Sequence, residues 1–414
     1  MKLTRMSLFP LGATVTITCL ALVGAASLCV ASSLGTGEAP AISLAERRVI
    51  DIPDSQLLAL SPDGASIAVS RPAGPTPTEL CIHDAVTLQE RMCADLGDLE
   101  ARLWIDSVVW SPDGAWLAFA ELWPQFFVDG DLWLLDASSG ALTNLLDDGY
   151  SGDLSPSAMD GDTITLPAYP AFTADGTAVT FSRSVIQDGE LRNVDVASVP
   201  IAGGDPVRVG DLGRARPDFD YWGKRWTADG SRLYVTLVAY QDTGLGPDSG
   251  IWVYEAGGSE ARQLLRVDEP DGWPPHIVAV SPHGEHLLVL YPGHSAGSAM
   301  APAYALVDGT TGAVESIEPP SQAGGASAPI IGVMLSPDGR TLMTVSGQRA
   351  KQVAVRGVTG SDEDVLMTES STPIPSALGG EVLTWARDGA VLINGDRNGL
   401  GTLLVLESDD QAGS

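Results

Sequence analysis

One turn sequence organises this chain, and its clearest copy lies in Val109-Trp110-Ser111-Pro112-Asp113-Gly114-Ala115-Trp116-Leu117-Ala118-Phe119. The turn of four residues recurs, with substitutions, at intervals of 50 to 62 residues. Its seven copies begin at Ser61, Ser111, Thr173, Thr227, Ser281, Ser336 and Ala386. A repeat of this length indicates structural units that are each too small to bury a hydrophobic face alone, so each unit must pack against its neighbours.

Short apolar runs flank every turn, such as residues 104–110 and 116–120 around the second copy. They are rich in β-branched and aromatic residues, and Pro, Asp and Gly bound them, which is typical of strand, turn and strand. Pro fixes φ at one corner of the turn, and Gly adopts the positive φ that closes the hairpin. A third strand, such as 131–136, and a fourth, such as 141–146, follow. Four antiparallel strands in each of seven repeats predict an all-β fold, a seven-bladed β-propeller.

The seventh repeat lacks a fourth strand. It contains apolar runs at 382–385, 391–393 and 403–406, and the chain then ends in an acidic tail. At the other end, residues 47–52 form a strand-like segment that precedes the first repeat and has no partners of its own. We expect this segment to supply the missing outer strand of the last blade, because closing the ring in this way removes two exposed sheet edges.

The repeat resembles the TolB-like, or WD40-like, propeller repeat (PD40-type) of bacterial extracytoplasmic proteins. The shared pattern is an apolar residue, Trp or Leu, Ser-Pro-Asp-Gly and a second apolar strand, as in residues 109–119. The resemblance covers about residues 47–407 and implies a propeller fold. TolB-type proteins carry an α/β domain before a smaller propeller, whereas here the first repeat follows closely on the N-terminal apolar segment. The resemblance therefore implies the repeat rather than a particular role.

The chain divides into four predicted parts. These are an export signal or membrane anchor at 1–37, a linker at 38–46, the propeller at 47–408 and an acidic tail at 409–414. Lys2 and Arg5 precede a mostly apolar segment from Leu11 to Ala31. Cleavage after Ala31, retention as an anchor, and lipid attachment at Cys19 or Cys29 are all open. Each outcome places the propeller outside the cytoplasm, periplasmic, secreted or anchored, because the positive end stays inside.

The chain is strongly acidic, with 53 Asp and Glu against 23 Lys and Arg and a formal charge of −30. Nucleic acid and anionic membrane surfaces are excluded as partners, because both require clustered basic residues. The membrane is therefore expected to contact only the N-terminal segment. After that segment only Cys81 and Cys93 remain, on the predicted third and fourth strands of the first blade. We expect a cross-strand disulfide; two buried thiols are the alternative.

Function is expected on the face built by the connections between blades and between second and third strands, because these loops are long. They cover residues 121–131, 147–168, 214–222 and 271–276. Aromatic residues and arginines gather there, a composition typical of protein interfaces. The candidate binding residues are Trp123, Phe126, Phe127, Arg214, Arg216, Tyr221, Trp222 and Trp273. The alternative is that these aromatics pack their own loops onto the propeller rim.

Catalytic and metal motifs are weak. Gly293-His294-Ser295-Ala296-Gly297 matches a nucleophile-elbow pattern, but no His follows it in the chain as that motif requires. Hard cations prefer several carboxylate oxygens, so Ca²⁺ is the cofactor to consider, on the weak candidates Asp129, Asp131, Asp160, Asp162, Asp218 and Asp220. We expect no other metal and no catalytic residue.

The leading hypothesis is an extracytoplasmic binding module, a monomeric propeller that recognises a protein, another envelope component or a carbohydrate-like ligand through its long-loop face. Two alternatives stay open. One is a lyase or hydrolase with a site at the mouth of the central channel on the same face, by analogy with other propellers. The other is a subunit that the N-terminal segment anchors beside a membrane complex.

Overall fold

The computed structural model describes the following residues: 44–52, 56–72, 77–85, 87–96, 108–121, 130–147, 163–187, 190–210, 219–241, 244–256, 260–267, 274–291, 294–295, 298–299, 303–317, 330–336, 338–346, 352–358, 363–367, 383–385, 391–396 and 401–408. They belong to one compact unit, residues 42–414. The predicted signal or anchor at 1–37 and the acidic tail at 409–414 lie outside the described residues. No helix long and apolar enough to span a lipid bilayer occurs in the described ranges.

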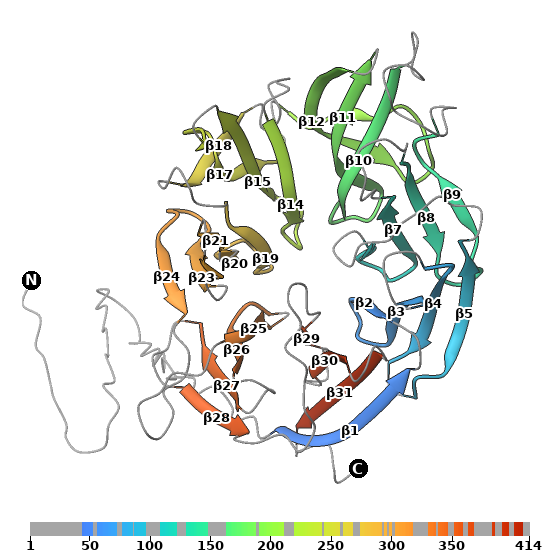
Figure 1. Cartoon of the computed structure of the whole chain (residues 1–414), viewed down its shortest axis with the longest axis vertical. Helices are drawn as coiled ribbons and strands as arrows, with labels where there is room; N and C mark the ends of the chain where they lie inside the picture. The colour runs from blue at the N-terminus through green and yellow to red at the C-terminus, as the bar shows by residue number, and fades with distance from the viewer. Residues whose placement is uncertain are drawn as a thin grey trace, which may run out of the picture. The chain divides into compact units, whose positions relative to one another are not determined.

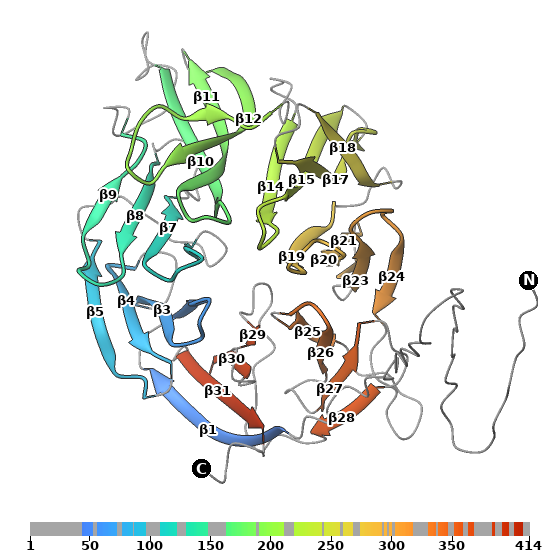
Figure 2. The ribbon, with the colours of Figure 1, turned by 180° about the vertical axis from the view of Figure 1, so that it is seen from behind.

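In this part of the chain, seven antiparallel sheets of four or five strands follow the seven turn repeats. We number them as blades one to seven (Figures 1 and 2). Blade one contains β2 (Gln56–Leu60), β3 (Ser66–Arg71), β4 (Glu79–Asp84) and β5 (Glu90–Asp95). Blade two contains β6 (Val108–Trp110), β7 (Trp116–Ala120), β8 (Leu132–Asp136) and β9 (Leu142–Asn144). Blade three contains β10 (Thr163–Phe172), β11 (Ala178–Gln187), β12 (Glu190–Pro200) and β13 (Val207–Arg208).

The next three blades keep the same order. Blade four contains β14 (Phe219–Trp226), β15 (Arg232–Gln241), β17 (Gly250–Glu255) and β18 (Ala261–Arg266), and β16 (Gly244–Leu245) pairs with β15. Blade five contains β19 (His276–Val280), β20 (His286–Tyr291), β23 (Ala303–Asp308) and β24 (Val314–Ile317). Its loop holds a small hairpin of β21 (His294–Ser295) and β22 (Ser298–Ala299). Blade six contains β25 (Ile330–Leu335), β26 (Thr341–Ser346), β27 (Gln352–Gly357) and β28 (Glu363–Met367).

Blade seven joins the two ends of the unit. It contains β29 (Leu383–Trp385), β30 (Val391–Asp396), β31 (Gly401–Ser408) and β1 (Leu44–Ile52). β1 pairs antiparallel with β31, from Leu44 opposite Ser408 to Ile52 opposite Gly401. This is the pairing predicted for the N-terminal strand. The strand begins at Leu44, slightly earlier than the start predicted at Arg47. Continuity of the whole ring stays a prediction, and a deletion described in the Discussion tests it.

The repeated turns are held by one side-chain motif. In five of the six turns that the structure describes, the Ser or Thr hydroxyl donates a hydrogen bond of 2.5–2.7 Å to the Asp two residues later. The same hydroxyl accepts the backbone N–H of the fifth following residue, at 2.9–3.1 Å. Gly114, in the second turn, has a φ of 71°, which a residue with a Cβ rarely adopts. The hydroxyl therefore fixes both ends of the hairpin.

Hydrogen bonding lowers the pKa of these turn carboxylates. For Asp113 the main cause is the Ser111 hydroxyl, and the N–H of Ala115 adds to it. The fifth turn has His283 in place of Asp, and there Ser281 donates instead to Glu285 at 2.9 Å. The backbone N–H of Glu285, followed by the Ser281 hydroxyl, lowers the pKa of the Glu285 carboxyl too. The turn thus retains its carboxylate although the residue that carries it has moved along the chain.

The hydrophobic core lies between neighbouring sheets rather than within them. Separate clusters of buried residues join blades one and two, two and three, three and four, four and five, and five and six. Phe119 and Leu80, for example, belong to the same cluster and are fully buried. Each blade therefore depends on the next for its burial, as the repeat length predicted.

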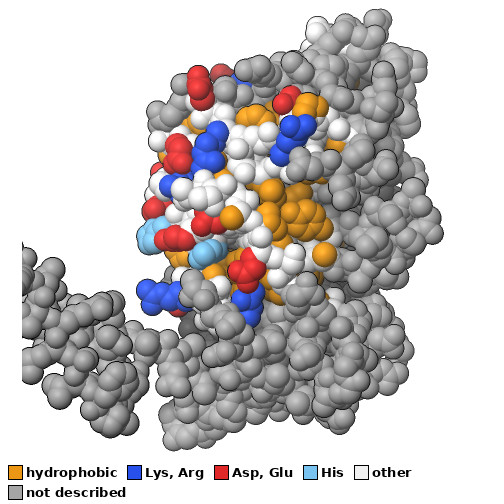
Figure 3. Space-filling model, turned by 90° about the vertical axis from the view of Figure 1, so that its left-hand side faces the viewer, with side chains coloured by type: hydrophobic (Ala, Val, Ile, Leu, Met, Phe, Trp, Pro, Cys, Tyr) orange, Lys and Arg blue, Asp and Glu red, His pale blue; other side chains and the backbone are white. Residues whose placement is uncertain are grey.

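Charged side chains of both signs are interspersed on the side of the molecule seen in Figure 3. Among the described residues, ion pairs join Arg232 with Glu255 at 3.2 Å and Arg356 with Glu315 at 3.1 Å. Such exposed pairs contribute little to stability. The fold rests on the clusters between blades and on the turns.

Candidate functional site

The two faces of the unit differ. Turns between first and second strands, and between third and fourth strands, form one face, which we call the turn face. Connections between second and third strands and between blades form the other, the long-loop face. Ten of the sequence-predicted residues on the long-loop face lie outside the described residues: Trp123, Phe126, Phe127, Asp129, Asp160, Asp162, Arg214, Arg216, Asp218 and Trp273. The described candidates on this face are Asp131, Asp220, Tyr221 and Trp222.

Tyr221 is a core residue. Its side chain is 1% exposed and belongs to the cluster between blades three and four. The expectation of an exposed aromatic ring is therefore wrong for Tyr221. Residues 219–222 lie in β14 rather than in a loop, and residues 163–168 likewise lie in β10. Phe219 and Tyr221 are two residues apart with Asp220 between them, a spacing that favours a half-buried strand and that the loop interpretation overlooked.

Asp131 closes the base of the blade-two loop. Its backbone N–H donates to the Glu121 carboxylate at 3.2 Å, and the backbone N–H of Glu121 donates back to the Asp131 carbonyl at 2.9 Å. Glu121 also accepts the Trp133 indole N–H at 3.0 Å, and the Asp131 carboxylate accepts the Asn144 amide at 2.7 Å. A Cβ on Gly130 would lie 2.7 Å from the Glu121 carbonyl oxygen, so this close approach requires glycine. The loop at 122–129 therefore starts from a fixed base.

Blade three extends further on the long-loop face than blade two. β10 and β11 have ten residues each, against five in β7 of blade two, and their extra length lies at the end where Thr163 pairs with Gln187. At about 3.3 Å per residue the extension is roughly 15 Å. A small apolar cluster of Ile164 with Leu166 and Ile186 packs within it. β10, β11 and β12 form an arm at the long-loop end of blade three.

An ion pair anchors the arm at its base. Arg183 on β11 donates to both carboxylate oxygens of Asp195 on β12, at 2.9 and 2.6 Å. The Asp195 side chain is 2% exposed and that of Arg183 is 18% exposed. A two-pronged Arg–carboxylate pair fixes direction as well as distance, so the arm leaves the blade at a defined angle.

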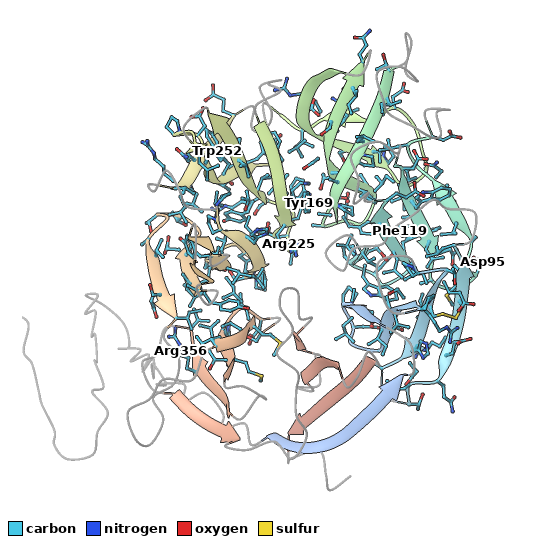
Figure 4. All side chains as sticks on the ribbon, in the orientation of Figure 1. Asp95, Phe119, Tyr169, Arg225, Trp252 and Arg356 are labelled. Atoms are coloured by element: carbon cyan, nitrogen blue, oxygen red, sulfur yellow. A yellow bond between two sulfur atoms is a disulfide. The ribbon has the colours of Figure 1, made fainter. Side chains whose placement is uncertain are left out.

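A buried lysine joins blades three and four. Lys224 on β14 is 1% exposed, and its Nζ donates to Ser182 Oγ on β11 at 2.7 Å. Ser182 in turn donates to the carbonyl of Tyr221. Nζ also lies 5.4 Å from the ring centroid of Tyr169 on β10, a distance that allows cation–π attraction. Figure 4 labels Tyr169 and the neighbouring Arg225 on the innermost strands of these two blades.

Tyr169 owes its position to an irregular backbone. Its φ is 51°, and the register of β10 against β11 shifts between Ala168 and Ala171. A positive φ is uncommon in residues other than glycine. A bulge of this kind turns one side chain away from the direction that the regular pleat would give it. The sequence analysis did not single out Lys224. A lysine among aromatic residues inside a strand was the available signal.

Ser182 and Lys224 do not have the hydrogen-bond polarity of a nucleophile and its base. Lysine donates to the serine, and the serine proton points to a backbone carbonyl. A base for nucleophilic attack would have to accept that proton. The pair therefore ties blade three to blade four.

Cys81 and Cys93 are joined by a disulfide across β4 and β5, at a Cα–Cα distance of 4.0 Å. The Arg71 guanidinium donates to both sulfurs, at 3.2 and 3.0 Å, and pairs with Glu79 and Glu90. The two groups of potential metal ligands among the described residues both include Cys81. Because the sulfurs are bonded to each other and face an arginine, these groups form a covalent cross-link rather than a metal site. The Ca²⁺ candidates stay a prediction.

No protein-family model matches the sequence, and no curated protein sequence matches it. Solved structures do match. Kuenenia stuttgartiensis hydrazine synthase has a TM-score of 0.55 and 14% identity over 87% of this chain and 97% of that one. An oligogalacturonate lyase from Vibrio parahaemolyticus gives 0.53 and 12% over 88% and 97%. The β-propeller domain of Cps50 (Swd1) from Myceliophteria thermophila gives 0.50 and 12% over 88% and 99%.

The chain is a β-propeller. The match to a known propeller domain, together with the four-stranded sheets of Figures 1 and 2, confirms the fold class predicted from the turn repeat. Matches at 12–14% identity show that the fold is shared. They do not assign the activity of any of these proteins to this chain. What this propeller does must be argued from its own side chains.

Proposed function

We propose that this propeller is an extracytoplasmic binding module that holds a protein partner on the long-loop face of blades two to five. The observation that carries the proposal is the raised arm of blade three. Its long strands, with the Arg183–Asp195 anchor, provide a rigid wall beside the loops that carry the aromatic residues. Rigid scaffolds with long loops are where binding residues concentrate.

The residues proposed to contact the partner are Trp123, Phe126, Phe127, Arg214, Arg216, Trp222 and Trp273. Large aromatics and arginine dominate the energetics of protein interfaces. Tyr221 is removed from this set, because its ring is buried between blades. The base of the blade-two loop is locked by Glu121, Asp131 and Asn144, which reduces the entropy lost when a partner orders the loop.

Two features support a location outside the cytoplasm. One is the apolar segment from Leu11 to Ala31 behind Lys2 and Arg5, which has the pattern of an export signal. The other is the disulfide between Cys81 and Cys93. Structural disulfides persist in oxidising compartments and are rare in the cytoplasm.

The test is capture from the native envelope fraction by the exported protein, with hydroxyl-radical footprinting of the captured complex. A triple variant, Trp123→Ala with Phe127→Ala and Trp273→Ala, should lose the partner. A matched control replaces exposed valines on outer strands of other surfaces, Val207→Ala with Val314→Ala, and should retain it. Protection confined to the long loops supports the proposal.

Equal capture by both variants, or protection elsewhere, refutes it. If no protein is captured and a small polymeric substrate is consumed instead, the lyase or hydrolase alternative at the channel mouth takes its place. The two outcomes separate because the first reads protein contact and the second reads product formation.

A further inference from the structure

The turn face contains an open cavity of about 380 Å³ between blades one and two. Its volume lies within the range of small-molecule sites in proteins. Two tryptophans, Trp110 and Trp116, line it, one on each side of the Ser-Pro-Asp-Gly turn of blade two. The polar lining comes from Ser66 and Arg91 of blade one and from the Asp136 hairpin of blade two.

The Trp110 indole is held from behind. Its side chain is half-buried and packs against the core cluster between blades one and two, and its N–H donates to the Ala59 carbonyl at 3.4 Å. The half-buried Trp116 side chain packs against the cluster between blades two and three, so the Trp110 ring is the one on the cavity's side of the blade-two sheet. A ring fixed in this way offers a flat apolar surface at little cost in side-chain entropy.

Arg91 supplies hydrogen-bond donors at the cavity wall. Nη1 donates to Ser66 Oγ at 2.6 Å, and Nη2 pairs with Asp84. A guanidinium has five N–H donors, and within the described part of the chain these two contacts are the ones that it makes. The side chain is 46% exposed. The arginine is thus oriented by the protein and retains donors for a ligand.

Asp136 supplies the acceptor. Its Oδ1 takes the backbone N–H groups of Ser138 and Ser139 and the Ser138 hydroxyl, at 2.7–2.9 Å. Within the described residues Oδ2 accepts none of these bonds. These hydrogen bonds, led by that of the Ser138 hydroxyl, lower the pKa of Asp136, so the carboxylate is ionised at neutral pH. One oxygen builds the hairpin and the other is available to the cavity.

We propose that this cavity is a binding site for a neutral sugar unit, separate from the long-loop face. A sugar ring has an apolar face of C–H groups, which suits an indole surface, and hydroxyls that both donate and accept. Arg91 and Asp136 match those two roles, and the positive charge of Arg91 is already balanced by Asp84. An anionic ligand would meet both Asp136 and the strongly acidic protein, with its formal charge of −30.

The test uses the full exported protein with cellotetraose and maltotetraose as probes, followed by saturation-transfer NMR and calorimetry. Tetragalacturonate serves as the anionic probe of equal length, and a tetrapeptide as the non-sugar probe. We expect one neutral tetrasaccharide to bind with a dissociation constant of about 1 mM or tighter. The strongest saturation should fall on ring C–H protons, which would face the Trp110 indole.

The decisive variant is Asp136→Asn, which keeps Oδ1 for the hairpin and replaces Oδ2 by an amide donor. It should weaken neutral-sugar binding about tenfold or more. The matched control is Asp308→Asn in the corresponding hairpin of blade five, where Asp308 Oδ1 accepts the Thr310 and Thr311 N–H groups in the same way. The control should bind like the wild type.

Three results would overturn the proposal. These are no binding of either neutral tetrasaccharide, equal binding by Asp136→Asn and the wild type, or preferred binding of tetragalacturonate or the peptide. Protein capture through the long-loop face is unaffected by any of them, because the two sites lie on opposite faces. Failure of one proposal therefore does not imply failure of the other.

Discussion

Replacing Ser111 by Ala tests whether the turn hydroxyl is a structural requirement of the repeat. Ser111 is 0% exposed, and its Oγ makes two hydrogen bonds: it donates to Asp113 at 2.6 Å and accepts the Trp116 N–H at 2.9 Å. Loss of the first costs about 1 kcal/mol, since the exposed carboxylate regains water, and the half-buried N–H left without its acceptor costs about 1 kcal/mol more. We expect Ser111→Ala to lower the free energy of unfolding by about 2 kcal/mol.

That loss translates into a small but measurable shift of the melting temperature. The entropy of unfolding is about 2.1 cal/mol/K per residue, so a propeller of about 360 residues should lose roughly 3 °C. The assay is calorimetry at pH 7 beside Ser139→Ala, an exposed serine in the next hairpin of the same blade. The control should change stability by less than about 0.5 kcal/mol. If both variants melt together, the hydroxyl is dispensable and the reasoning is wrong.

The effect should also depend on pH. The Ser111 hydroxyl holds the pKa of Asp113 below its ordinary value of 3.8. A carboxylate whose pKa is lowered by folding adds stability above its unfolded pKa, and that stability is lost as the pH falls toward the folded pKa. The difference between wild type and Ser111→Ala should therefore be full at pH 7 and shrink below about pH 4. A constant difference across that range would contradict the assigned cause.

Three further predictions follow from the same geometry. In the fifth turn, Glu285→Ala should lower the melting temperature, because Ser281 loses its carboxylate partner. The added change His283→Asp should restore the melting temperature, because it returns a carboxylate to Ser281. If calorimetry finds no such rescue, the turns are not equivalent. Ser182→Ala should lower the free energy of unfolding by about 3 kcal/mol, measured in urea, because it leaves a buried ammonium and a buried carbonyl with one hydrogen bond fewer. Lys224→Met should lower it by less, because methionine fills the volume of the lysine without a charge. The reverse order would refute the tie between the two blades. Deletion of residues 46–53 should lower the melting temperature and leave the edge of β31 unpaired, so that the protein aggregates, measured by light scattering. An unchanged melting curve would show that β1 does not close the ring.

The sequence predicted most of the fold because its chemistry is local. Ser111, Asp113 and Gly114 satisfy one another within a single hairpin, so the turn can be recognised without knowing what surrounds it. The pairing of β1 with β31 was also predictable, since one segment lacked partners and one sheet lacked a strand. The cross-strand disulfide likewise lies between the two strands to which the repeat assigned Cys81 and Cys93.

The candidate site was harder to predict, because its features depend on contacts between blades. Tyr221 was placed on the surface because its segment combines aromatic residues with arginines, yet packing between blades three and four buries the ring. From its charge alone, Lys224 would be placed in solvent. Its burial is possible because Ser182 of the neighbouring blade accepts a hydrogen bond from the ammonium and offsets part of the loss of hydration. The cavity beside Trp110 and Trp116 needs two adjacent blades to exist at all.

The pairing of the first strand with the last has a consequence for biosynthesis. β1 is among the first parts of the propeller to leave the ribosome, and its partner β31 is the last strand to be made. Contacts this distant along the chain form slowly, because the intervening polymer must first be brought together. A chain that stops short of residue 401 leaves β1 without its partner. The last sheet therefore cannot be completed until residues 401–408 have been made, and until then β1 has an unpaired edge.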